Sequence, residues 1–152
     1  MATLSAVTSR ASTTPTHLWV IGIVALLWNA FGAVDYLMTV TENEAYMSSF
    51  TEAQRAYFYS FPVWAISAWA LAVWSAVFGS VALLLRRRWA VGLFAVSLLS
   101  MLVSSLYTFG LSEGVKVMGG GLGQWLFTLA IWLVAIGLYF YARAQRAQGV
   151  LR

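Results

Sequence analysis

Two polar side chains, Asn29 and Asp35, lie within a stretch of the sequence that is otherwise strongly apolar. On a helix, Asp35 lies about 120° round the axis from Asn29 and roughly 9 Å further along it. Both can therefore border one broad polar face, together with Tyr36. A carboxylate is costly in lipid, so Asp35 must find hydrogen-bond donors, contact water or remain protonated. Two interpretations are open: the pair belongs to a site for a solute or a proton, or it forms hydrogen bonds between helices.

A second set of polar residues repeats at helical spacing further along the chain. Hydroxyl side chains recur in steps of three and four residues, which places them on one face of a helix: Ser97, Ser100, Ser104 and Thr108. Gln124 and Thr128 form a shorter pair at the same spacing. Such hydroxyls could line a polar cavity with Asn29, Asp35 and Tyr36. They can equally donate to carbonyls of their own helix and pack against a neighbour.

Small residues form further stripes that predict close helix packing. The two on the first apolar segment are Gly22 and Gly32, and those on the second are Ala65, Ala68, Ala72, Ala76 and Gly79. In lipid, small side chains allow two helix backbones to approach closely, and packing then drives their association.

Enzymatic chemistry finds little support in the sequence. The chain has no cysteine and one histidine, His17, so thiolate catalysis and a pair of histidine ligands to haem are excluded. No nucleophile stands at a recognisable spacing from a base, and no acid and histidine cluster indicates a metal site. We therefore expect neither an enzyme nor a bound cofactor or metal.

The elements that must position these residues are four apolar segments. Of the 152 residues, 61% are hydrophobic and 9% charged, too few charges for a soluble domain of this size. The segments span about 18–40, 62–85, 89–111 and 122–142, each long enough to cross a bilayer as a helix. The sequence predicts an all-α bundle of four transmembrane helices over 18–142, with the lipid bilayer as its surroundings. The flanks are a mobile tail, 1–17, and a basic tail, 143–152.

The loop between the first two segments predicts one more helix. Thr51 and Gln54 have the spacing of a capping box, and Pro62 is suited to open the next helix. Aromatic residues between them are typical of the membrane interface. We expect a short interfacial helix on the outer surface, either as part of an aromatic belt or as a lid over an outward cavity.

The cations predict the orientation. Seven of the nine fall before the first segment, between the second and third, or after the fourth. The positive-inside rule therefore places both termini in the cytoplasm. Arg86, Arg87 and Arg88 would anchor the turn between segments, or also grip anionic lipid headgroups. Because topology explains these charges, nucleic acid is not expected as a partner.

Two stretches, "WNAFGAVDYLMT" and "YFYSFPVWAISAWALAVWSAVFGSVALLLRRRWAVGLFAVSLLS", resemble a group of small four-span bacterial membrane proteins. Members are sometimes labelled sugar transporters, and no established binding residues come with the group. The resemblance implies a bacterial inner-membrane protein. Two functions are expected: a small-solute carrier or solute-binding protein with its site around Asn29 and Asp35, or an accessory or scaffold subunit. Either would act as a homo-oligomer or within a larger membrane complex.

Overall fold

The computed structural model describes residues 14–152, and this part of the chain is helical without any strand. Four long helices dominate it: α1 (Thr16–Val40), α4 (Val63–Leu84), α5 (Ala90–Leu106) with its π-helical continuation η1 (Tyr107–Leu111), and α7 (Leu122–Ala147). All four are long and apolar enough to cross a membrane. The predicted all-α bundle of four helices is confirmed, and the chain is a multi-pass membrane protein.

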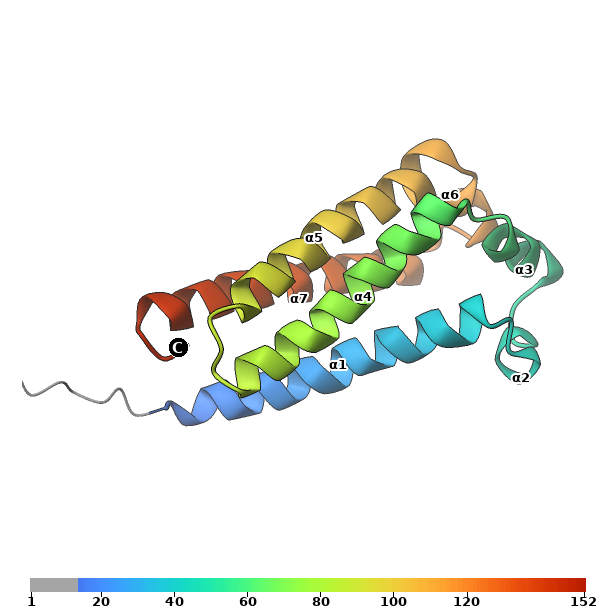
Figure 1. Cartoon of the computed structure of the whole chain (residues 1–152). Coiled ribbons are helices and arrows are strands. Elements are labelled where there is room, and N and C mark those ends of the chain that lie inside the picture. The colour runs from blue at the N-terminus through green and yellow to red at the C-terminus, as the bar shows by residue number, and fades with distance from the viewer. Residues whose placement is uncertain (1–13) are drawn as a thin grey trace, which may run out of the picture.

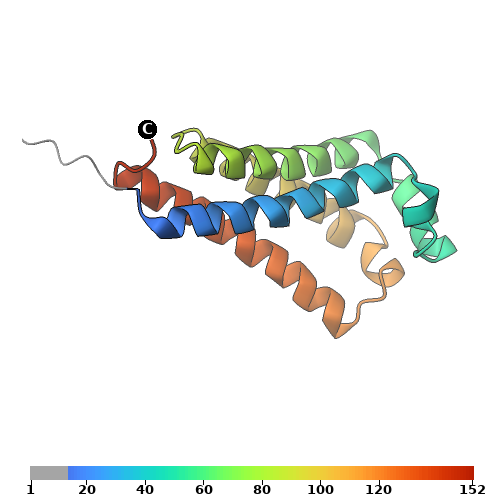
Figure 2. The ribbon, with the colours of Figure 1, turned by 90° about the horizontal axis from the view of Figure 1, so that it is seen from below.

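The four helices run up and down, with α4 between α1 and α5 (Figure 1). One end of the bundle, called the closed end here, holds the start of α1, the turn from α4 to α5 and the C-terminus (Figure 1). The opposite end, the open end, holds the three short helices. Figure 2 shows that α7 lies near α1 at the closed end and diverges from it toward its own beginning. The bundle is therefore splayed on the side of α7.

Burial follows this arrangement. In the most apolar window of α4, 39% of the residues are buried inside the protein, against 11% in that of α7. The packed core gathers at the closed end, where Leu18, Leu83, Phe94 and Leu151 are almost fully buried. Helix α4 is thus the central helix of the bundle, and α7 is attached mainly at its C-terminal half.

The C-terminal segment closes this end and differs from the predicted basic tail. Helix α7 continues to Ala147, and Gly149, with a φ of 73°, lets the chain reverse. The backbone N–H of Arg152 then donates to the carbonyl of Arg86 at 2.7 Å, and the N–H of Arg88 donates to the carbonyl of Arg152 at 3.0 Å. The side chains of Val150 and Leu151 are buried in the packed core at this end. Two apolar residues in a basic stretch are the reason that this segment packs.

Three short helices occupy the open end: α2 (Glu44–Met47), α3 (Glu52–Tyr59) and α6 (Gly114–Val117). Helix α3 begins with the predicted capping box, in which Thr51 and Gln54 each accept a backbone N–H of the other. Its position at a membrane interface stays a prediction.

The predicted mobile tail, residues 1–17, lies mostly outside the described residues, which begin at Thr14. Its last two residues, Thr16 and His17, belong to α1.

Candidate functional site

A cavity of about 290 Å³ lies between α7 and the other three long helices. It extends from Phe94 and Leu138 inside the bundle to Asp35 and Thr108 toward the open end. Most of its wall is apolar. The polar side chains that line it are Asn29 and Asp35 of α1, Ser97, Ser104 and Ser105 of α5, Thr108 of η1 and Thr128 of α7.

Most of the site residues that the sequence predicts line this cavity. Five of the seven candidates line it: Asn29, Asp35, Ser97, Ser104 and Thr108. The other two, Tyr36 and Ser100, do not. The ring of Tyr36 instead meets the ring of Trp69 edge-on, with 5.2 Å between centroids.

Asn29 takes part in helix packing and also lines the cavity. Its amide donates to the hydroxyl of Ser80 on α4 at 2.9 Å and lies 3.4 Å from the carbonyl of Ala76. The Ser80 hydroxyl, fully buried, donates in turn to that same carbonyl at 2.9 Å. Asn29 therefore joins α1 to α4, as the interpretation of hydrogen bonds between helices requires.

Part of the hydroxyl stripe of α5 is also hydrogen-bonded within the protein. Ser97, which is buried, donates to the carbonyl of Ala72 on α4 at 2.8 Å. Thr108 donates to the carbonyl of Ser104 in its own helix at 3.2 Å. These bonds satisfy the hydroxyls without a solute, so the stripe both packs helices and borders the cavity.

Asp35 differs because its partner comes from outside the four long helices. The hydroxyl of Tyr46, on α2, donates to its carboxylate. Burial, the hydrogen bond to Asp35 and the negative charge of that carboxylate together raise the pKa of Tyr46 from 10.0 to about 12. Tyr46, which is neutral at physiological pH with the ordinary pKa as well, therefore keeps its proton to a higher pH than a free tyrosine. The sequence carries no signal for this contact, because it depends on how the loop folds back over α1.

Aromatic side chains make up much of the remaining wall. Three tryptophans and four phenylalanines line the cavity, and they come from all four long helices and η1. On one side the rings of Trp28 of α1 and Phe127 of α7 lie 6.3 Å apart, and both keep much of their surface exposed. Phe31, 69% exposed, lines the cavity beside them. The cavity therefore reaches the protein surface between α1 and α7.

The small-residue stripes serve both packing and the cavity. All five members on α4 are buried. A Cβ at Gly79 would lie 2.9 Å from the ring of Phe94, and a Cβ at Gly22 would lie 2.5 Å from Leu84. At Gly32, which lines the cavity, a Cβ would meet nothing within 4 Å. The absence of a side chain at Gly32 thus leaves space rather than a close helix contact.

A second, smaller cavity of about 90 Å³ lies at the open end among α3, η1, α6 and the start of α7. The hydroxyls of Tyr57 and Ser112 are hydrogen-bonded at 2.8 Å, and a Cβ at Gly114 would collide with the Tyr57 hydroxyl and the Thr108 carbonyl. Helix α3 is therefore held tightly against α6. Thr108 and Phe109 of η1 line both cavities, so η1 lies between the two.

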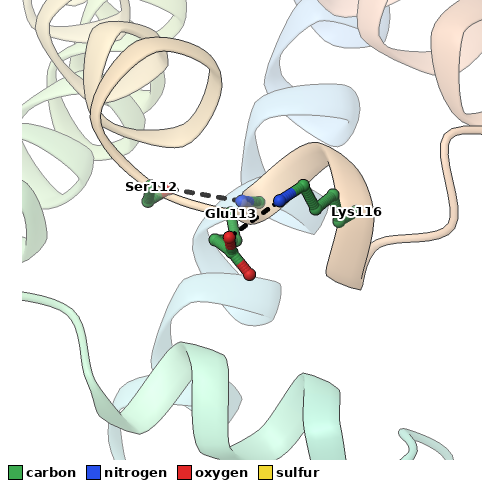
Figure 3. Close-up of polar contacts among 4 residues, drawn as sticks. Ser112, Glu113 and Lys116 are labelled. Atoms are coloured by element: carbon green, nitrogen blue, oxygen red, sulfur yellow. Dashed lines mark hydrogen bonds and ion pairs between the residues drawn. The ribbon is translucent and has the colours of Figure 1, made fainter.

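Beside this contact lies a surface ion pair. The hydroxyl of Ser112 accepts the backbone N–H of Gly114, and the ammonium of Lys116 donates to the carboxylate of Glu113 at 2.8 Å. Dashed lines mark these contacts in Figure 3. The Lys116 ammonium lowers the pKa of the Glu113 carboxyl. Both side chains are more than two thirds exposed, so the pair contributes little to stability.

The three predicted anchoring arginines lie at the closed end. Arg87 and Arg88 are exposed, while Arg86 is half-buried and donates to the hydroxyl of Thr14. Nearby, His17 of α1 and Tyr141 of α7 are hydrogen-bonded at 2.6 Å, which fastens α7 to α1 at this end.

Comparison of the chain with protein-family models, with curated proteins and with solved structures finds no match.

Proposed function

We propose that this membrane protein binds a small, largely apolar solute in the cavity between α7 and the other three long helices, as a small-solute carrier or a solute-binding protein. The observation that carries the proposal is the cavity of about 290 Å³ with its few polar groups. Sites for small molecules are typically concave and mostly apolar, with a small number of polar groups that orient the ligand. The volume is at the lower limit of that class, so the solute is small.

The route into the cavity supports the same solute class. Its opening between α1 and α7 is bordered by Trp28, Phe31 and Phe127, in the part of the bundle that would face lipid. A solute with an apolar body partitions into the bilayer and can reach this opening from there. A strongly hydrophilic solute such as a sugar would meet few hydrogen-bonding groups along the apolar wall.

We also propose that the protein lies in a bacterial inner membrane with both termini in the cytoplasm. The backbone bonds between Arg152 and the turn at Arg86 and Arg88 support this orientation, because they bring two of the cationic regions to the same end. Because the chain has no cysteine, single cysteines at Arg87 and at Glu113 test it directly. A membrane-impermeant thiol reagent added to spheroplasts should label the cysteine at 113 and spare the one at 87.

The test of solute binding uses the tryptophans of the wall. Trp28, Trp69 and Trp132 line the cavity, whereas Trp19, Trp74 and Trp89 do not. Incorporation of 5-fluorotryptophan gives each indole its own fluorine NMR signal in lipid nanodiscs. Neopentylbenzene, a neutral aromatic probe, should shift the first three signals in a saturable manner and leave the other three unchanged.

A matched pair of variants locates the effect. Gly32→Leu fills the cavity from α1, because nothing stands within 4 Å of its Cβ. Gly137→Leu adds the same side chain to an exposed position of α7 outside the cavity wall, where the Cβ also meets nothing. Gly32→Leu should abolish the saturable shifts and Gly137→Leu should preserve them. Shifts that are equal in both variants would contradict the proposed site.

The low burial of α7 favours a second candidate function, an accessory subunit. A helix with 11% of its window buried has most of its surface available to a helix of a larger complex. In that case the probe would shift no cavity tryptophan, and the protein in native nanodiscs would have a mass above that of its own oligomer.

A further inference from the structure

The cavity wall carries one formal charge, the carboxylate of Asp35. Among the described residues that line the cavity there is no lysine, arginine or histidine. The single ion pair in the described part of the chain is the one between Lys116 and Glu113, far along the sequence in α6. Within residues 14–152 no cation therefore pairs with the carboxylate of Asp35, and the hydroxyl of Tyr46 is its hydrogen-bond donor.

The rest of the wall suits a positive charge. Trp28, Trp69 and Trp132 line the cavity, and indole is the side chain whose π-system attracts cations most strongly. An aromatic wall with one carboxylate is complementary to a molecule that has an apolar body and one cationic group. A neutral or anionic molecule of the same size would leave Asp35 without a counter-charge or would be repelled by it.

We infer that the cavity takes a small organic cation, an amine or quaternary ammonium with an apolar body, and that Asp35 is its counter-charge. This inference rests on the proposed function and specifies its substrate class. The cationic group lies near Asp35 toward the open end, and the apolar body extends toward Phe94 and Leu138. The hydroxyl of Tyr46 donates to Oδ1 of Asp35, so a cation that approaches this oxygen competes with Tyr46 for it.

Two probes of the same shape test the charge by itself. Benzyltrimethylammonium and neopentylbenzene differ by the exchange of the charged nitrogen for a carbon atom. Both are titrated against the full chain in nanodiscs of zwitterionic lipid, with the signals of Trp28, Trp69 and Trp132 as the readout. The cation should bind more tightly than its neutral counterpart after correction for partition into protein-free nanodiscs.

Variants at the carboxylate complete the test. A hydrogen bond or contact to a charged group is worth about 1.5–3 kcal/mol, so Asp35→Asn should weaken binding of the cation roughly tenfold to a hundredfold and leave neopentylbenzene unchanged. Glu113→Gln, which removes an exposed carboxylate at the same end, should change neither. Tyr46→Phe should strengthen binding of the cation, because it removes the competing donor while the acid stays in place. This variant also tests the inference if Asp35→Asn does not fold.

The outcomes separate the inference from the function on which it rests. If both probes shift the cavity tryptophans with equal affinity, and neither Asp35→Asn nor Tyr46→Phe changes the cation's affinity, the cationic substrate is wrong and the solute site stands. If neither probe shifts those signals, both the inference and the solute site are overturned.

Discussion

The two glycines of α1 show how differently one helix face is used at the two ends of the bundle. At Gly22, near the closed end, an added Cβ would lie 2.5 Å from Leu84 of α4, whereas at Gly32 it would meet nothing within 4 Å. The same residue type thus permits close packing at one position and leaves a cavity at the other. The difference shows that a stripe of small residues defines a helix face but not what fills the space beside it.

The position of α7 explains the difference. At the closed end, α7 is fastened by the bond between His17 and Tyr141 and by the buried Val150 and Leu151. Toward the open end α7 diverges from α1 (Figure 2). The cavity lies in the space that this divergence leaves between the two helices. Stability should therefore depend on the closed end, and ligand binding on the space that the divergence leaves.

The largest loss of stability should come from shortening a buried side chain at the closed end. Leu151 is 1% exposed within the core, so Leu151→Ala should lower the free energy of unfolding by about 2–5 kcal/mol, from lost burial and a new cavity. Leu133→Ala, on a lipid-exposed position of α7, serves as the control and should cost far less. Unfolding by SDS in mixed micelles measures both. Equal losses would show that the C-terminal segment is not part of the packed core.

A matched pair of glycine variants should give opposite signs. In Gly79→Ala the new methyl group would lie 2.9 Å from the ring of Phe94, which is 2% exposed and must shift, at a cost of about 1–3 kcal/mol. In Gly32→Ala the methyl group enters open space, and relief of the glycine's backbone entropy should stabilise the helix by about 0.5–1 kcal/mol. Melting temperatures in detergent compare the two. A loss of stability at Gly32 would mean that the cavity is closed.

A smaller effect should come from the polar link between α1 and α4. A double-mutant cycle with Asn29→Ala and Ser80→Ala should give a coupling of about 0.6 kcal/mol, the average for hydrogen bonds between membrane helices. The cycle of Asn29→Ala with Ser100→Ala is the control, since no bond joins these two residues, and it should be additive. Additivity in the first cycle would show that the hydrogen bond between Asn29 and Ser80 does not stabilise the packing of α1 against α4.

The smallest effect, at the open end, is spectroscopic. The raised pKa of Tyr46 means that the folded protein keeps this proton while the unfolded chain loses it, so its contribution to stability falls as the pH rises from about 10 to about 12. Tyr46→Phe should remove tyrosinate absorbance that develops above about pH 11. Asp35→Asn should move this absorbance to lower pH. A loss of absorbance near pH 10 in Tyr46→Phe would show that Tyr46 is not held over Asp35.

The amino-acid sequence predicts the elements of this fold well, because their signals are local. The runs of apolar residues predict four helices close to their observed bounds, and the spacing of Thr51 and Gln54 predicts the start of α3. The helical period also predicts that the residues around Asn29 and those around Ser97 lie on faces of helices. Five of those candidate residues do meet at one cavity.

What the sequence does not predict depends on contacts between distant segments. Tyr46 reaches Asp35 only because the loop after α1 turns back over that helix. The amide of Asn29 is bound to Ser80, a residue without any signal of its own in the second apolar segment. The buried Val150 and Leu151 lie in a stretch for which the sequence predicts only a basic tail. The splay of α7 likewise follows from packing and not from any period in the sequence.

Thiol accessibility shows whether a solute can reach the space beside α7 while the interface of α1 and α4 is closed. Single cysteines replace Ser104, on the cavity wall, and Ser80, which is fully buried, in this chain without native cysteine. A benzyl methanethiosulfonate reagent, whose apolar body can enter the opening from lipid, is added to the protein in nanodiscs, with Leu133→Cys on the lipid-facing side as the control. We expect rapid modification at position 104, prevented by benzyltrimethylammonium, and little at positions 80 and 133. Modification at 104 as slow as that at 80 would contradict the account.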